Sequence, residues 1–176
     1  MSAEWTSLVA ASATAFTTLV FARAALHKLG DFTTFTGFVA DYQVVSERQV
    51  APVSMALAAA EVVVVAAAFL PGLQPLGMVV AIGLYLLYAA VIGLNVARGR
   101  DRVECGCGGA PQPLSWTLVT RNLVLAAIAA IGLAGPISAL GVAEALTAIV
   151  SGLTLFVGYQ LVEQIMANFA QMRLKR

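Results

Sequence analysis

Long apolar runs separated by short polar segments dominate the pattern of this chain. Five such runs occupy residues 5–26, 51–70, 76–97, 114–133 and 137–162. A helix of about 20 apolar residues crosses a hydrocarbon core of about 30 Å. The pattern therefore predicts an all-α protein, a helical bundle with five membrane-spanning helices.

The segment at residues 31–46 has a different pattern. Its apolar side chains, among them Phe32, Phe35 and Tyr42, recur at the spacing of one helical face. Asp31 precedes them and is suited to cap the first turn. We therefore expect a short amphipathic helix that lies in the membrane interface or packs against the bundle.

Composition agrees with this pattern. Hydrophobic residues make up 60% of the 176 residues and charged residues 11%, whereas a soluble domain has about 45–50% and about 25%. The chain is therefore expected to be an integral membrane protein, and its length predicts one domain over residues 1–176. The net charge of +1 argues against nucleic acid as a partner and leaves membrane lipids as the expected surroundings.

The distribution of basic residues predicts an orientation. All ten Lys and Arg residues fall on one side of the expected bundle, and the turns at residues 71–75 and 135–136 carry none. Cytoplasmic connections are enriched in Lys and Arg. We therefore expect a protein of the cytoplasmic (inner) membrane with its N-terminus outside. The C-terminus and the loop at residues 98–113 would lie in the cytoplasm.

Charged side chains inside the apolar runs must find partners. Glu61 lies about 15 Å from the cytoplasmic end of its run, and Arg121 lies about 10 Å deep in the fourth run. An unpaired ion at such depth is costly. We therefore expect Glu61 to pair with Arg121, with Arg23 as the second candidate partner.

The role of this polar group stays open at this point. Asn95 and Asn122 add neutral polar side chains to it. It could be a polar core that only specifies the bundle, or a site for a lipid headgroup, a quinone or a proton. Arg23 could instead extend its charged end to the membrane surface.

The only two cysteines, Cys105 and Cys107, are separated by Gly106 and followed by Gly108 and Gly109. A disulfide between them would close a small, strained ring, and strained exposed disulfides are labile. The glycines allow the positive φ angles that such a ring, or a closely approaching partner, requires.

Three interpretations of this pair compete. The first is a redox-active dithiol. The second is half of a metal site completed by His27, although zinc sites usually have four ligands and no good fourth is found. The third is a pair of inert thiols, since the cytoplasm keeps thiols reduced. Spacing and composition do not separate the three.

Several short motifs follow one another along residues 23–125. They are, in chain order, Arg23 and Lys28, the aromatic series Phe32, Phe35 and Tyr42, Glu61, Asn95-x-x-Arg98-Gly99, Cys105-Gly-Cys107-x-Gly109, and Leu114-Ser-Trp116 followed by Arg121-Asn122-Leu123. This order is similar to the MauE branch of the DoxX-like membrane proteins. Gly108 departs from the pattern, which has an aromatic residue there.

The resemblance implies a redox-associated membrane protein with a four-helix core and the fifth spanning helix packed outside it. Cys105 and Cys107 would be its redox pair, supported within the membrane by Glu61, Arg121 and Asn122. The namesake is associated with maturation of methylamine dehydrogenase, whose small subunit carries many disulfides. The resemblance also implies a thioredoxin-like or other redox protein as partner, and a quinone as the one cofactor that relatives suggest.

The preferred hypothesis is therefore a thiol–disulfide redox component that uses Cys105 and Cys107. Two alternatives belong to other classes. One is a non-catalytic subunit that anchors or assembles a partner enzyme in a membrane protein complex. The other is a small-molecule or lipid transporter that uses a cavity between Glu61 and Arg121.

Overall fold

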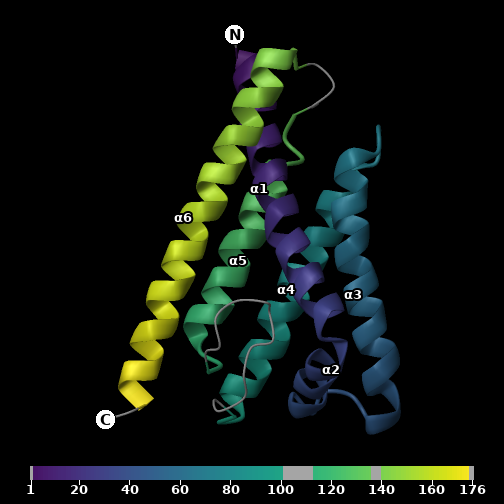
Figure 1. The fold of residues 1–176 in the computed structure, drawn as a ribbon, viewed down its shortest axis with the longest axis vertical. Coiled ribbons are helices and arrows are strands. Elements are labelled where there is room, and N and C mark those ends of the chain that lie inside the picture. Colours follow the sequence, from purple (N-terminus) through teal and green to yellow (C-terminus); the bar gives the residue numbers. More distant parts are fainter. Residues whose placement is uncertain (1, 101–112, 136–139, 175–176) are drawn as a thin grey trace.

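A computed structural model of the chain describes residues 2–100, 113–135 and 140–174. These residues form six helices and no strand (Figure 1), which confirms the all-α prediction. In chain order the helices are α1 (Ser2–Gly30), α2 (Phe32–Asp41), α3 (Glu47–Phe69), α4 (Gln74–Ala97), α5 (Trp116–Ile131) and α6 (Val142–Leu174).

Four of the described helices, α1, α3, α4 and α6, are long and apolar enough to cross a membrane. The chain is accordingly a multi-pass membrane protein. Helix α5 is apolar but has only 16 residues, about 24 Å of helix, and is shorter than the apolar run that predicted it. The orientation in the membrane stays a prediction.

Helix α1 is the central element of the bundle. It packs against α3, α5 and α6, while α4 packs between α3 and α5. In Figure 1, α6 runs along one side of α1, α3 lies on the other side, and α4 crosses α1 on its way from α3 toward α5. The two ends of the chain lie at opposite ends of the bundle, and α2 lies at the end where α6 finishes.

Small residues let the helices approach closely at two points. A Cβ atom on Gly77 of α4 would lie 2.8 Å from the Ala67 Cβ of α3. A Cβ atom on Gly152 of α6 would lie 2.6 Å from the Ala15 Cβ of α1. Real Cβ atoms do not come this close, so each glycine is needed for the observed packing.

The amphipathic helix forms as predicted, over a shorter range. Asp31 caps α2, because its carboxylate accepts hydrogen bonds from the backbone N–H (3.0 Å) and the hydroxyl (2.7 Å) of Thr34. These hydrogen bonds hold the pKa of Asp31 below its usual value. Phe35 of α2 and Tyr42, just after it, are buried against the bundle.

Helix α3 begins four residues before the apolar run that predicted it. The side-chain oxygen of Gln49 accepts a hydrogen bond from the backbone N–H of the N-cap residue Ser46 at 3.3 Å, which favours this earlier start. Pro52 is consequently inside the helix rather than in its first turn. Glu61 lies fourteen residues from the helix start, about 21 Å along the axis.

Candidate functional site

A fully buried ion pair joins α1 to α3. The Lys28 ammonium donates to Oε1 of Glu61, and the Tyr88 hydroxyl of α4 donates to the same oxygen at 2.7 Å. The Lys28 side chain is 2% exposed and the Glu61 side chain is 0% exposed. Because the opposite charges cancel, the group can stay in a low-dielectric interior that would reject either ion alone.

The two oxygens of Glu61 are used unequally. Both donors go to Oε1, and Oε2 is buried without a hydrogen-bond partner among the described residues. Buried carboxylate oxygens usually have a partner. The charges of the pair therefore balance, but its hydrogen-bonding capacity is not fully used.

An apolar cavity of about 170 Å³ adjoins this pair. Its walls come from α2, the connection after it, α3 and α4, together with Lys28 of α1; Tyr88 of α4 is also a lining residue. Lys28 Nζ lies 5.0 Å from the ring centroid of Phe35, another lining residue, and 5.3 Å from that of Tyr88. An apolar pocket with a few convergent polar groups is the usual form of a small-molecule site.

Tyr42 adds a further polar group to the cavity wall. Burial raises the pKa of the Tyr42 phenol above its usual value. The hydroxyl therefore keeps its proton at neutral pH and remains a hydrogen-bond donor.

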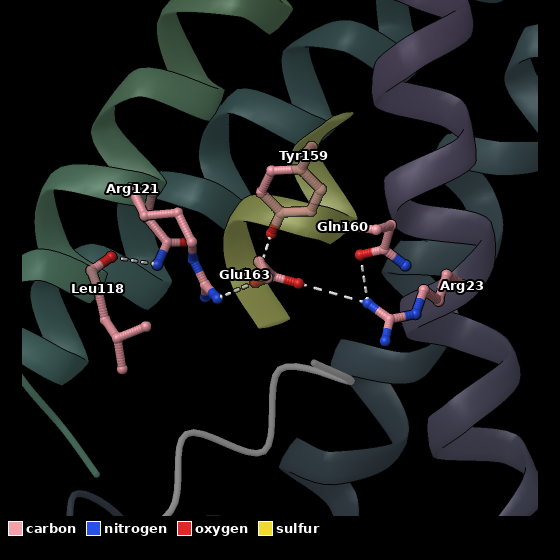
Figure 2. Close-up of polar contacts among 7 residues, drawn as sticks. Arg23, Leu118, Arg121, Tyr159, Gln160 and Glu163 are labelled. Atoms are coloured by element: carbon pink, nitrogen blue, oxygen red, sulfur yellow. Dashed lines mark hydrogen bonds and ion pairs between the residues drawn. The ribbon is translucent and has the colours of Figure 1, made fainter. Parts of the chain in front are cut away.

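A second ionic cluster joins α6 to α1 and α5. Figure 2 shows the Glu163 carboxylate of α6 between two arginines. Oε1 accepts from Arg121 Nη1 of α5 at 2.5 Å and from the Tyr159 hydroxyl at 2.7 Å. Oε2 lies 3.4 Å from Arg23 Nη1 of α1, which also donates to the side-chain oxygen of Gln160 at 2.6 Å. Among the described residues, one carboxylate thus serves two guanidinium groups.

The predicted Glu61–Arg121 pair is wrong. Glu61 pairs with Lys28, and Arg121 pairs with Glu163. Arg121 lies only five residues from the start of α5, about 8 Å along the axis, whereas Glu61 lies about 21 Å from the start of α3. The two side chains therefore differ in depth, and each meets a partner at its own level. The expected Glu61/Arg121 cavity is replaced by the cavity beside Lys28 and Tyr88.

The two asparagines are buried as neutral polar groups outside these ion pairs. The Asn122 amide donates to the Leu118 carbonyl at 2.8 Å, and the Asn95 amide donates to the Val91 carbonyl at 3.0 Å. The backbone carbonyl of Asn95 accepts from the backbone N–H of Arg98 and of Arg100, where α4 ends. These backbone bonds hold residues 98 and 100 at the end of α4.

The cysteine pair and its glycines lie outside the described residues. The predictions for Cys105, Cys107, Gly106, Gly108 and Gly109 therefore remain sequence predictions. His27, the third ligand of the metal alternative, has an exposed side chain. Within the described ranges, no three His, Cys, Asp or Glu residues could hold a metal ion together.

The site residues that the sequence missed are Lys28 and Glu163. Both were placed outside the apolar runs, because those runs were taken to end at residues 26 and 162. The helices continue to Gly30 and to Leu174. A usable signal was present, since His27 and Lys28 precede the first glycine after the first apolar run and a helix continues readily up to a glycine.

Comparison with known proteins places the chain in a family. The family described as "Methylamine utilisation protein MauE" matches residues 5–135, a range that includes α2 to α5 and all but the first residues of α1. No solved structure matches the chain.

Curated relatives agree with this match. The chain is 36% identical to methylamine utilization protein MauE of Paracoccus denitrificans over 82% of this chain and 80% of that one. It is 36% identical to the protein of the same name from Methylophilus methylotrophus over 86% and 82% of the two chains. The Methylorubrum extorquens protein is 37% identical over 68% and 65%. With a family match over most of its length and relatives above 30% identity, this chain belongs to the MauE family.

Proposed function

We propose that this protein is a membrane-embedded thiol–disulfide redox component of a methylamine-utilisation system, with Cys105 and Cys107 as its redox pair. The C-x-C spacing within a glycine-rich segment is the observation that carries the proposal. Membership of the MauE family supports the biological context, because its curated relatives are named for methylamine utilisation.

The proposed step balances as an ordinary disulfide exchange. A thiolate of the partner protein attacks one sulfur of the Cys105–Cys107 disulfide, which forms a mixed disulfide and releases the other cysteine as a thiolate. A second partner thiolate then attacks the mixed disulfide. The partner gains a disulfide, and Cys105 and Cys107 become two thiols that hold the two electrons.

The described parts of the chain supply a firm base for this segment. Backbone bonds to the Asn95 carbonyl hold Arg98 and Arg100 on one side of it. On the other side, Leu114 is 2% exposed and packs with Tyr42, Ile92 and Leu118. The segment that carries the cysteines therefore begins and ends at fixed points of the bundle.

Trapping the mixed disulfide tests the proposal. In a methylotroph that depends on this chain for its MauE function, Cys105→Ser and Cys107→Ser are made singly and together. One single variant should accumulate a partner that is released by reductant. The variant's remaining cysteine thiolate attacks the disulfide of the oxidised partner, which is the reverse of the exchange, and no second cysteine is present to resolve the mixed disulfide. The double variant should lose the disulfides of the partner and growth on methylamine.

A matched control keeps both sulfurs in place. Ser115→Ala alters a residue of the same connection, and it should trap no partner and should grow normally. Since the chain has only two cysteines, labelling of thiols reports on this pair alone. Normal growth of the double serine variant would reject the redox function and leave the anchoring or assembly subunit as the better account.

A further inference from the structure

The cavity between α2, α3 and α4 has the size of one six-membered ring. Its volume is about 170 Å³. An engineered protein cavity of roughly 150 Å³ with apolar walls takes up benzene. The cavity could therefore accept a single substituted ring, whereas a fused two-ring system would need additional space.

The Lys28 ammonium is the one charged group among the described residues that line the cavity. An ammonium group has three N–H donors, and among the described residues only Glu61 accepts a hydrogen bond from it. Its Nζ is held 5.0 Å from the Phe35 ring and 5.3 Å from the Tyr88 ring, both of which line the cavity. A ligand in this space would therefore meet a buried donor and would gain most from an acceptor oxygen.

The charge of the site selects a neutral ligand. Lys28 and Glu61 together carry no net charge, and both are almost completely removed from solvent. An anionic ligand would compete with Glu61 and leave an unbalanced negative charge in an apolar interior. A carbonyl oxygen accepts from the ammonium without that cost.

The walls indicate that the ligand comes from the lipid phase. Leu57, Leu87 and Ile92 are typical of the lining, which is almost entirely apolar. Helices α3 and α4, which carry these residues, are both long enough to span the membrane. A ring with an alkyl tail could therefore place the ring in the cavity and leave the tail among lipid chains.

We propose that this cavity binds the single-ring head of a lipid-soluble carbonyl compound of the benzoquinone class, with Lys28 donating to a ring carbonyl. This binding goes beyond the proposed thiol chemistry and does not depend on it. The Cys105→Ser, Cys107→Ser double variant should therefore bind the ligand as well as the natural chain does, so each proposal can fail without the other.

A matched pair of tryptophan variants tests the location. Val91 of α4 lines the cavity, whereas Val79 of the same helix is 56% exposed. The probe is dimethylbenzoquinone carrying a decyl chain, titrated into the purified full chain in lipid nanodiscs. Val91→Trp should weaken binding by about tenfold or more, because the added ring fills the cavity, and Val79→Trp should leave binding unchanged. Equal binding by the two variants would overturn the proposal.

Three further measurements test the chemistry of recognition. Decylbenzene, which lacks the carbonyls, should bind about tenfold more weakly than the benzoquinone. Methylnaphthoquinone with the same decyl chain should also bind more weakly, because its second ring does not fit. The double variant Lys28→Met, Glu61→Leu removes the polar anchor without leaving a lone charge and should reduce the preference for the benzoquinone over decylbenzene.

Each of these three measurements can reject a different part of the proposal. Equal affinity for decylbenzene and the benzoquinone would show a non-specific apolar site and reject the carbonyl contact with Lys28. Equal or tighter binding of the naphthoquinone would reject the single-ring assignment. An unchanged preference in the Lys28→Met, Glu61→Leu variant would show that another group recognises the carbonyl.

Discussion

The two ionic clusters of this protein use the same chemistry in opposite settings. Lys28 and Glu61 form a one-to-one pair that is almost completely buried, with side chains 2% and 0% exposed. Glu163 serves two arginines, and the Arg23 side chain at its edge is 40% exposed. The first cluster is buried throughout, whereas the second is open to solvent at Arg23, although its carboxylate is only 7% exposed.

The more deeply buried carboxylate, Glu61, is the less completely hydrogen-bonded of the two. Both oxygens of Glu163 accept from other side chains. Oε2 of Glu61 has no partner among the described residues. The buried Lys28–Glu61 pair is therefore held by charge complementarity. The cluster of Glu163 with Arg23 and Arg121, called the outer cluster below, has a fuller set of hydrogen bonds. Burial therefore makes each ion of the Lys28–Glu61 pair indispensable to the other, whereas access to water at Arg23 makes that partner replaceable.

The largest effect should come from breaking the buried pair. Glu61→Gln leaves Lys28 without its counter-charge, and Lys28→Met leaves Glu61 alone. Each should cost about 3–5 kcal/mol of stability. The double variant Lys28→Met, Glu61→Leu should be more stable than either single variant, because no lone ion remains. Unfolding by SDS titration in mixed micelles measures these differences.

Glu144 provides the control for the loss of an acid. Its side chain is exposed and accepts from the backbone N–H of Gly141 at 2.6 Å. Glu144→Gln should therefore change stability much less than Glu61→Gln. A double variant of Lys28 and Glu61 that loses as much as the two single variants added together would show that the pair is not coupled.

Coupling free energies of intermediate size should show that the two clusters are independent of each other. A double-mutant cycle between Arg121→Gln and Glu163→Gln should give a coupling free energy of about 0.5–3 kcal/mol, since the two side chains are in contact. The same cycle between Arg121→Gln and Glu61→Gln should be additive within about 0.5 kcal/mol. Strong coupling in the second cycle would merge the two clusters into one.

The smallest effect should come from the exposed edge of the outer cluster. Arg23→Gln removes a guanidinium that lies 3.4 Å from Glu163 Oε2 and is partly solvated. Arg121 and Tyr159 still satisfy the other carboxylate oxygen. The loss in stability should stay below about 1 kcal/mol and should shrink further as salt is added. A loss as large as that of Lys28→Met would show that the two clusters do not differ as described.

The sequence predicted the helices better than their interior contacts. Runs of about twenty apolar residues are a strong signal, and they located α1, α3, α4 and α6. The stripe through Phe35 and Tyr42, with Asp31 before it, located α2 and its cap. The family was also identified from the order of short motifs. These features depend on residues close together along the chain.

The ion pairs depend on depth, which the sequence set only through the ends of the helices. Moving the start of α3 from Ala51 to Glu47 increased the distance from that start to Glu61 by four residues, about 6 Å. An error of this size is enough to select the wrong partner for a side chain at membrane depth. Lys28 and Glu163 were excluded for the same reason, since each lies just beyond an apolar run and yet inside a helix.

The two clusters also differ in their position relative to the residues that match the family. Lys28, Glu61 and Tyr88 all lie within residues 5–135, whereas Glu163 lies on α6, after the matched range. The outer cluster therefore joins α6 to the part of the chain on which the family match rests. Loss of the Glu163 contacts should loosen α6 before it disturbs the buried pair.

The close contact between Gly152 and α1 also affects how α6 is attached to the bundle. With no side chain on Gly152, α6 rests almost directly on the backbone at Phe16, where a Cβ would lie 2.9 Å from the amide nitrogen. Sliding α6 along its axis by three or four residues, about 5–6 Å, would bring a side chain from the same helix face into this contact and push the two helices apart. The close contact at Gly152 thus sets the axial register of α6 against α1. That register in turn sets the level at which Glu163 meets both arginines.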